Sequence, residues 1–242
     1  MPKPTIVLVH GAWADGSSWN AVASELRGQG FTIYTPTNLL RGVKQDSDYV
    51  ASFLAQRTSG PVVLVGHSYG GFVITNAATG NGDVTALVYV DAFAPDEGET
   101  VFQILGGSGS AFDVPDPSTV LDIVGYPGGP EGDAEAFLKP DTVHNSFAQD
   151  LPEADRWLIA ESQRPITLSA NTTPSGAAAW KTLPSWTVVG TEDRVIPPDT
   201  QRHMADRAGA TISEAAGSHV SLVSWPQASI DAILAAVAAV GD

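Results

Sequence analysis

The stretch Pro61–Phe72, P-V-V-L-V-G-H-S-Y-G-G-F, constrains the fold of this chain more than any other. Its apolar run Val62–Val65 is short and mostly β-branched, which is typical of a strand buried on both faces. Gly66-His67-Ser68-Tyr69-Gly70 follows directly, and the apolar spacing from Phe72 to Ala78 then predicts a helix. A strand, the pattern G-x-S-x-G and a helix in this order indicate a sharp turn that carries a serine nucleophile.

The two glycines of this pattern have a steric reason. On so tight a turn, side chains two residues before and two residues after the serine would collide, so both positions favour glycine. The hydroxyl of Ser68 would then project at the carboxyl end of the strand. The N-terminus of the next helix, with its partial positive charge, would face the same place. The alternative is a glycine-rich connection that holds an ordinary serine.

Strands and helices alternate along the rest of the chain, with an interruption in the middle. Such alternation predicts an α/β fold with a mostly parallel six-stranded sheet and helices on both faces. Besides the run before Ser68, strands are expected at Thr5–Val9, Phe31–Pro36, Thr85–Val90, Ser185–Val189 and Ala210–Ala215. Helices are expected at Trp19–Arg27, from Asp46 or Ser47 to Arg57, from Pro197 or Pro198 to Ala208, and at Trp225–Val240.

The interruption predicts an inserted cap. Between residues 97 and 180, glycine clusters alternate with short pieces of helical pattern around Ala134–Leu138 and Pro152–Ser162. The strand rhythm resumes only afterwards. We therefore expect a core formed by residues 1–96 and 181–242, and a helical cap, or lid, formed by residues 97–180.

Composition excludes several classes of function. The chain of 242 residues has 12 Lys and Arg against 27 Asp and Glu, a net charge of −15. This balance argues against nucleic acid or an anionic membrane as a partner. Cysteine is absent, and neither a zinc motif nor a nucleotide-binding glycine motif occurs, so we expect no metal and no cofactor. No apolar stretch precedes the first strand, which favours a cytoplasmic protein.

Parallel sheets place their functional sites at the carboxyl ends of the strands, where the polar residues of interest in this chain also fall. A serine hydroxyl needs a neighbouring base to take its proton. Of the five histidines, His219 lies in a Gly-Ser loop after the last expected strand, from which it could reach back over the sheet edge. We predict that His219 is this base.

The base needs an acid that orients its ring and stabilises the imidazolium. Asp193 follows the fifth expected strand and is the preferred candidate; Asp91, after the fourth strand, is its rival, and Glu192 is a weaker neighbour. The order Ser68, Asp193, His219 agrees with the order of nucleophile, acid and base in α/β-hydrolases. The oxyanion of a tetrahedral intermediate needs backbone donors, and we expect them to be the N–H groups of Ala12 and Tyr69.

Taken together, these motifs resemble the α/β-hydrolase superfamily over the whole chain, and within it the bacterial relatives of the plant hydroxynitrile lyase and methylesterase group. The matching segments are V-L-V-H-G-A-W (7–13), V-L-V-G-H-S-Y-G-G (63–71), V-Y-V-D-A-F-A-P (88–95), A-W-K-T-L-P-S-W (179–186) and T-E-D-R-V-I-P-P (191–198). The resemblance implies the α/β-hydrolase fold, a triad of Ser68, Asp193 and His219, and an oxyanion hole of Ala12 and Tyr69.

The chain departs from the lyases at two places. Where they carry a lysine directly after the catalytic histidine, this chain has Val220, and where they carry a threonine near the end of the first strand it has Gly11-Ala12. Both departures favour hydrolysis. We therefore expect a serine esterase that acts on small, uncharged, moderately hydrophobic esters. A hydroxynitrile lyase, a cofactor-free perhydrolase and a non-catalytic small-molecule receptor remain alternatives.

Substrate contacts are harder to predict, because the cap would supply most of them. We expect Trp13, Phe102, His144, Trp157 and Val220 to contact the substrate, although the aromatic residues of the cap could equally well form its own core. The protein is expected to be a monomer or a homodimer.

Overall fold

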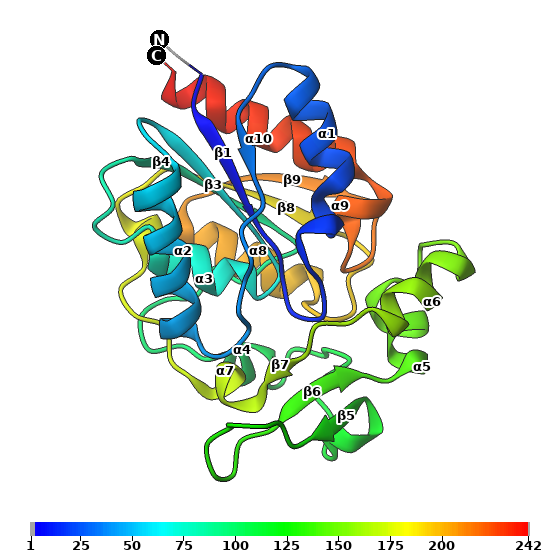
Figure 1. Ribbon diagram of the computed structural model, residues 1–242. Helices are drawn as coiled ribbons and strands as arrows, with labels where there is room; N and C mark the ends of the chain where they lie inside the picture. The colour runs from blue at the N-terminus through cyan, green and yellow to red at the C-terminus, as the bar shows by residue number, and fades with distance from the viewer. Residues whose placement is uncertain (1–2, 242) are drawn as a thin grey trace.

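A computed structural model describes residues 3–241, and its centre is a six-stranded parallel sheet (Figure 1). The strand order is β2-β1-β3-β4-β8-β9. The strands are β1 (Thr5–Val9), β2 (Ile33–Tyr34), β3 (Val62–His67), β4 (Val84–Val90), β8 (Ser185–Gly190) and β9 (Thr211–Ala215). All six lie where the sequence predicts strands, and the parallel sheet is confirmed.

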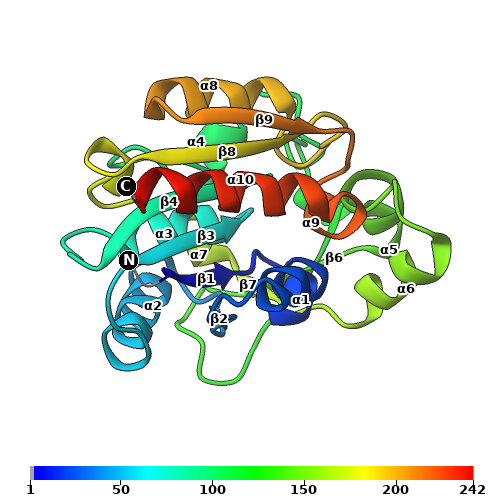
Figure 2. The same ribbon diagram turned by 90° about the horizontal axis from the view of Figure 1, so that it is seen from above.

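Helices cover both faces of this sheet, as Figures 1 and 2 show. One face carries α1 (Asn20–Gly28) and α10 (Pro226–Val240), and the other carries α2 (Val43–Arg57), α3 (Gly70–Ala77) and α8 (Pro198–Ala208). Because both faces are covered, every residue of β3 and β8 is buried. This explains why β3 begins with the continuous apolar run Val62–Val65, and why even the polar residues Ser185 and Thr187 of β8 are buried.

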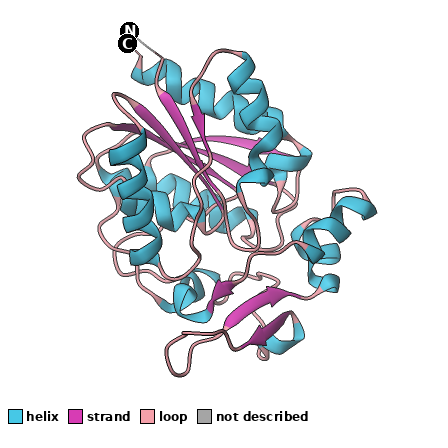
Figure 3. Cartoon of the chain, in the orientation of Figure 1, coloured by secondary structure: helices cyan, strands magenta, loops and turns pink. Residues whose placement is uncertain are grey.

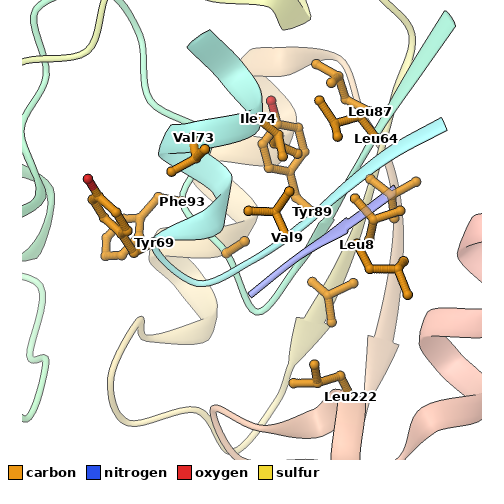
Figure 4. Close-up of a cluster of buried hydrophobic side chains, with 14 of the residues drawn as sticks. Leu8, Val9, Leu64, Tyr69, Val73, Ile74, Leu87, Tyr89, Phe93 and Leu222 are labelled. Atoms are coloured by element: carbon orange, nitrogen blue, oxygen red, sulfur yellow. The ribbon is translucent and has the colours of Figure 1, made fainter. Parts of the chain in front are cut away.

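The hydrophobic core begins directly behind Ser68. Figure 4 shows Val73 and Ile74 of α3 packed against Val9 and Tyr89, which belong to the central strands β1 and β4. All four side chains are buried. Since α3 starts two residues after Ser68, this packing fixes the helix and with it the turn that presents the serine.

Helix α2 starts earlier than the sequence predicts, at Val43 and not at Asp46 or Ser47. The buried carboxylate of Asp46 accepts hydrogen bonds from the backbone N–H groups of Arg41 and Gly42, which directly precede the helix, and so holds the chain at its start. The hydroxyl of Tyr69 donates to the same carboxylate at 2.8 Å. Asp46 therefore ties the start of α2 to the residue after Ser68.

The segment between β4 and β8 contains a second, antiparallel sheet with the order β5-β6-β7, which Figure 3 shows beneath the core. Its strands are β5 (Leu121–Val124), β6 (Glu135–Leu138) and β7 (Ile166–Thr167), and its helices are α4 (Val101–Leu105), α5 (Pro140–Thr142), α6 (Glu153–Glu161) and α7 (Leu168–Thr172). The helical reading of Ala134–Leu138 is wrong. Ala136 and Leu138 are buried while Glu135 and Phe137 are half-buried, which is the two-residue period of a strand.

Short elements complete the path between these layers. A 3₁₀ turn, Gly16–Trp19, is capped by Asp15 and leads into α1, and α9 (Ser221–Ser224) lies between His219 and α10. Among residues 3–241, no helix is long and apolar enough to cross a membrane.

Candidate active site

Ser68 occupies a strained turn between β3 and α3. Its φ is 53°, a left-handed conformation that few non-glycine residues adopt. A Cβ atom on Gly66 would lie 2.7 Å from the carbonyl oxygen of Gly70, and one on Gly70 would lie 2.6 Å from the carbonyl oxygen of Val9. Backbone atoms cannot give way as a flexible side chain can. Both glycines are therefore required for the turn that holds Ser68.

The structure brings Ser68, His219 and Asp193 together from three separate loops. Nε2 of His219 lies 2.7 Å from Oγ of Ser68, and Nδ1 of His219 lies 2.8 Å from Oδ2 of Asp193. All three side chains are buried. Since a carboxylate only accepts, the network assigns the proton to Nδ1, so that Nε2 accepts the hydrogen bond from the serine hydroxyl.

The carboxylate of Asp193 is held by three further donors. Its Oδ1 accepts the backbone N–H groups of Val195 at 2.7 Å and Ile196 at 3.0 Å, and its Oδ2 accepts Nε2 of Gln201 at 2.8 Å. Sequence reasoning missed Gln201. It lies in the first turn of α8, and no motif marks it, although the helix that starts at Pro198 had been predicted.

Burial shifts the pKa values of the acid and the base in opposite directions. It lowers the pKa of His219 to about 3, which keeps the imidazole neutral and able to take a proton at neutral pH. It raises the pKa of Asp193, and the N–H donors of Ile196, Val195 and Gln201 act against this. With these donors and the ring N–H of His219, Asp193 is well placed to carry the negative charge.

Asp91, the rival acid, lies close to Asp193 but does not bond to His219. Its Oδ2 accepts the backbone N–H of Ser221 at 2.9 Å, and its Oδ1 has no hydrogen-bond partner within residues 3–241. Burial raises the pKa of Asp91 well above its usual value, and the neighbouring charge of Asp193 raises it further. Two buried carboxyls so close together are unfavourable when both are ionised, so a single negative charge on the pair is favoured. Asp193 has more hydrogen-bond donors to hold that charge.

Two backbone N–H groups beside Ser68 are free. Within the described part of the chain, the amides of Ala12 and Tyr69 donate to no other group, whereas the next amide, that of Trp13, bonds to the carbonyl of Arg164. The loop after β1 can lie this close to Ser68 because residue 11 is a glycine: a Cβ atom there would lie 2.7 Å from Cβ of Ser68. The strand-end loop and the serine are thus packed directly against each other.

Two hollows adjoin these residues, and Trp13 belongs to both. The first, of about 60 Å³, lies under the cap; Ser68, Ala12 and Tyr69 line it together with apolar side chains that include Phe93, Phe102, Phe112 and Leu121. The second is an open cleft of about 280 Å³ on the side of α6 and α9. Its lining is Trp13, Ala14, Asp15, Ser17, Ser18, His67, Phe147, Leu151, Asp155, Leu158, Ile159, Ser162, Val220 and Val223.

The predicted substrate contacts divide between these hollows and the cap. Trp13 and Phe102 line the first hollow, and Val220 lines the second. His144 and Trp157 are absent from both linings; their rings pack against each other, 4.5 Å apart, in the cap. The structure thus places these two residues together and outside the lining of both hollows.

The other histidines near the site have structural partners. Nδ1 and Nε2 of His10 lie within hydrogen-bond distance of the carbonyl of Gly11 and the backbone N–H of Asn38. Nε2 of His67 donates to the carbonyl of His219 at 2.7 Å and so supports the loop that carries the base. Within residues 3–241, no group of three or more His, Asp and Glu side chains is arranged to hold a metal ion.

Comparison with known proteins agrees with this architecture. The model of the alpha/beta hydrolase family matches residues 6–235, and the chain therefore belongs to this family. A segment of 114 residues is 37% identical to the carbendazim-hydrolysing esterase of Nocardioides sp. (strain SG-4G); it covers 41% of this chain and 46% of that esterase.

Two solved structures illustrate how far the fold is shared. Polyneuridine aldehyde esterase superposes with a TM-score of 0.80 at 20% identity, covering 96% of this chain and 98% of that one. The methylesterase MES16 from Arabidopsis superposes with a TM-score of 0.75 at 20% identity, covering 97% and 99%. At such identities the likeness establishes the fold alone.

Proposed function

We propose that this protein is a carboxylic ester hydrolase in which Ser68 is the nucleophile, His219 the general base and Asp193 the acid that orients it. The observation that carries the proposal is the continuous hydrogen-bonded chain from Ser68 through His219 to Asp193, with bonds of 2.7 and 2.8 Å. Geometry of this kind activates a serine hydroxyl that is otherwise a poor nucleophile.

Acylation uses the groups that adjoin the first hollow. Oγ of Ser68 bonds to the carbonyl carbon of the ester while its proton passes to Nε2 of His219. The carbonyl oxygen becomes an oxyanion, and the free N–H groups of Ala12 and Tyr69 donate to it. When the intermediate collapses, the bond between carbon and the alcohol oxygen breaks, and His219 gives its proton to the departing alcohol.

Deacylation repeats these steps with water. Nε2 of His219 takes a proton from water, whose oxygen attacks the carbonyl carbon of the acyl-enzyme. The bond to Oγ of Ser68 then breaks, and the proton returns to Ser68. Throughout, Asp193 keeps Nδ1 of His219 protonated and stabilises the imidazolium.

The site favours hydrolysis over the alternatives on the same three residues. Val220, which follows the base, is buried and apolar and so offers no cation for cyanide. Hydrogen cyanide release from mandelonitrile tests the lyase, and peracid formation from acetate and hydrogen peroxide tests the perhydrolase. A receptor without turnover would bind small molecules but leave Ser68 unlabelled by a fluorophosphonate.

The deciding experiment measures hydrolysis of p-nitrophenyl esters by the wild type and by Ser68→Ala. Removal of the nucleophile should lower kcat/KM by at least about three orders of magnitude and abolish fluorophosphonate labelling. Ser52→Ala, on the exposed side of α2, is the matched control and should behave as the wild type. Equal activity of the wild type and Ser68→Ala would overturn the proposal.

A further inference from the structure

The first hollow, which Ser68 lines, offers a substrate very few polar groups. Within the described residues 3–241, none of the side chains around it is charged, and most are apolar. Polar atoms occur in four of these side chains, those of Trp13, Ser68, Tyr69 and Asn171. A charged group would lose its hydration in such surroundings without gaining a partner of opposite charge, so the hollow favours uncharged molecules.

Two of these four side chains are already bonded to the protein. Nε1 of Trp13 donates to the carbonyl of Ala136 at 2.8 Å, and the hydroxyl of Tyr69 donates to Asp46 at 2.8 Å. The hydroxyl of the nucleophile is required for the reaction itself. Asn171 therefore carries the remaining polar group with which the hollow can recognise a substrate.

The carboxamide of Asn171 has a free acceptor. Its Nδ2 donates to the carbonyl of Thr167 at 3.1 Å, and this bond assigns the nitrogen and oxygen ends of the group. Its Oδ1, which has two lone pairs, accepts no hydrogen bond from any residue between 3 and 241. Since Asn171 lines the hollow and is only half-buried, a bound molecule with a donor can reach this oxygen.

The short helix α7, which carries Asn171, is anchored on both sides. The backbone N–H of Ser169 donates to Oδ1 of Asp133 at 3.0 Å and its hydroxyl donates to Oδ2 at 2.7 Å, while the N–H of Leu168 donates to the carbonyl of Ala134 at 2.8 Å. Helix α7 also contacts α4, which lies beside it beneath the core (Figure 1) and lines the same hollow. An acceptor that is held in place before binding loses less entropy when it binds.

An ester that reacts with Ser68 shares this hollow with Asn171. Its carbonyl carbon must lie at Oγ of Ser68, with the carbonyl oxygen toward the N–H groups of Ala12 and Tyr69. The hollow measures about 60 Å³. A cavity that holds benzene is larger, roughly 150 Å³. In so small a space, a substituent a few bonds from the carbonyl carbon can reach the carboxamide of Asn171.

The free acceptor favours a hydroxyl as this substituent. A hydroxyl donates a hydrogen bond and carries no charge, whereas an ammonium group would bring a charge into an uncharged lining. An analogue with a methyl group at the same place would displace water from Oδ1 without replacing its hydrogen bond. A site with such a polar group discriminates strongly against the analogue that lacks the donor.

We propose that Asn171 determines the substrate specificity of the enzyme: its Oδ1 accepts a hydrogen bond from a hydroxyl group on a small, uncharged ester, and such hydroxy esters are preferred over their methyl isosteres. This inference rests on the proposed esterase function and adds the substrate class.

Pairs of esters in which a hydroxyl replaces a methyl group test the preference on both sides of the ester bond. On the acyl side, methyl glycolate is compared with methyl propionate, and methyl 3-hydroxypropionate with methyl butyrate. On the alcohol side, 2-hydroxyethyl acetate is compared with propyl acetate. The quantity measured for each pair is the ratio of kcat/KM for the hydroxy ester to kcat/KM for its isostere.

This ratio is then compared between the wild type and Asn171→Leu, which has a side chain of similar size without the acceptor. For at least one pair the ratio should fall at least about tenfold in Asn171→Leu, and it should fall likewise in Asn171→Ala. The comparison cancels the intrinsic reactivities of the two esters. Each ratio is measured on one preparation, so the folded fraction of a variant cancels as well.

Two controls accompany these variants. Asn145→Leu makes the same change at an exposed position of the cap, outside the lining of the hollow, and should leave every ratio at its wild-type value. Methyl 3-methoxypropionate, whose ether oxygen only accepts, is compared with methyl pentanoate, and Asn171→Leu should leave this ratio unchanged. A fall equal to that of the hydroxy esters would assign the bond to Nδ2 and overturn the role of Oδ1.

The outcomes separate this inference from the esterase. If esters are hydrolysed and every ratio is the same in the wild type and in both Asn171 variants, the role of Asn171 is wrong and the esterase stands. If Ser68 is labelled by a fluorophosphonate but no hydroxy ester is hydrolysed, the substrate class is wrong and the serine nucleophile stands. If no ester is hydrolysed and Ser68 is not labelled, the esterase is wrong, and the role of Asn171 is overturned with it.

Discussion

The side chain of Asp91 accepts a hydrogen bond from the backbone N–H of Ser221 at 2.9 Å, and Ser221 lies two residues after His219. A carboxyl at the end of β4 thus anchors the loop that carries the base, although it does not touch the base itself. Burial and the nearby charge of Asp193 raise the pKa of Asp91, which favours the neutral acid at this position.

A neutral carboxyl can be replaced by an amide, which gives the first prediction. Asp91→Asn keeps an acceptor for the N–H of Ser221, and kcat/KM at pH 7 should stay within about threefold of the wild type. Asp91→Ala leaves that buried donor without a partner, which costs about 2 kcal/mol of stability, or a Tm lower by about 4–8 °C. Ester kinetics and thermal unfolding measure both.

If Asp91 were ionised, Asp91→Asn would change the pH profile of kcat/KM. Removing a negative charge near His219 would lower the pKa of the histidine, so Asp91→Asn would displace the acid limb of kcat/KM toward lower pH. A profile that coincides with that of the wild type agrees with the neutral form, and a displaced one contradicts it.

The second prediction concerns pH and follows from the buried base. Burial lowers the pKa of His219 from its ordinary 6.5 to about 3, and the base must be neutral to act. As the pH falls, kcat/KM should therefore keep its plateau through pH 6.5 and decline only below about pH 5. Initial rates on a non-ionising ester, followed in a pH-stat, measure the profile.

In this experiment, activity lost because the protein unfolds in acid must be separated from activity lost because His219 is protonated. His10, His67 and His219 have lowered pKa values in the folded state, about 4, 3 and 3, so the stability that they contribute is present above pH 6.5 and is lost as the pH falls toward these values. Samples held at each pH are returned to pH 7 and assayed. An acid limb centred near pH 6.5 with full recovery would show an ordinary histidine and contradict the prediction.

Much of the fold could be predicted from the sequence because its signals are local. Buried parallel strands give continuous apolar runs such as Val62–Val65, and the turn at Ser68 needs Gly66 because of its contact with Gly70, four residues on. The preference for Asp193 over Asp91 rests on its place just after the fifth expected strand, since the order of nucleophile, acid and base fits either aspartate. In the structure, Asp193 lies within hydrogen-bond distance of His219, whereas Asp91 bonds to the backbone N–H of Ser221.

Other features depend on contacts that no local pattern encodes. Glu135–Leu138 looks helical in isolation and becomes a strand because it pairs with two distant neighbours, Leu121–Val124 and Ile166–Thr167. The position of His144 against Trp157 depends likewise on how α6 packs in the cap. Gln201 acquires its role only because the start of α8 is folded back over Asp193.

The third prediction concerns Gly71, where α3 lies against the backbone of Phe93. A Cβ atom on Gly71 would lie 1.9 Å from the carbonyl oxygen of Phe93, closer than any real contact. Gly71→Ala should therefore cost about 3 kcal/mol and lower the Tm by roughly 6–12 °C, if the variant folds at all. Gly82→Ala is the control, since a Cβ atom there meets nothing within 4 Å. Equal stability of the two variants in thermal unfolding would refute this account of the glycine.

The last prediction tests whether Gln201 positions the acid. Its Nε2 donates to Oδ2 of Asp193 and to the carbonyl of Ile196, both at 2.8 Å, so it holds the carboxylate in line with the His219 ring. Gln201→Met keeps the length of the side chain and removes the donor, and kcat should fall about tenfold with KM little changed, because the reaction and not binding is affected. Gln201→Glu places a further carboxyl beside Asp193 and should reduce kcat further.

The exposed Gln227 of α10 provides the matched control for this substitution. Gln227→Glu makes the same chemical change far from Asp193 and should leave kcat and KM at their wild-type values. A purely structural role for Gln201 predicts that its variants lose stability and keep kcat per folded molecule. The measured kcat is therefore referred to the number of active sites, counted by fluorophosphonate titration. If kcat per titrated site stays at the wild-type value in both Gln201 variants, the carboxylate of Asp193 does not depend on Gln201 for its orientation, and the backbone N–H groups of Val195 and Ile196 are sufficient to hold it.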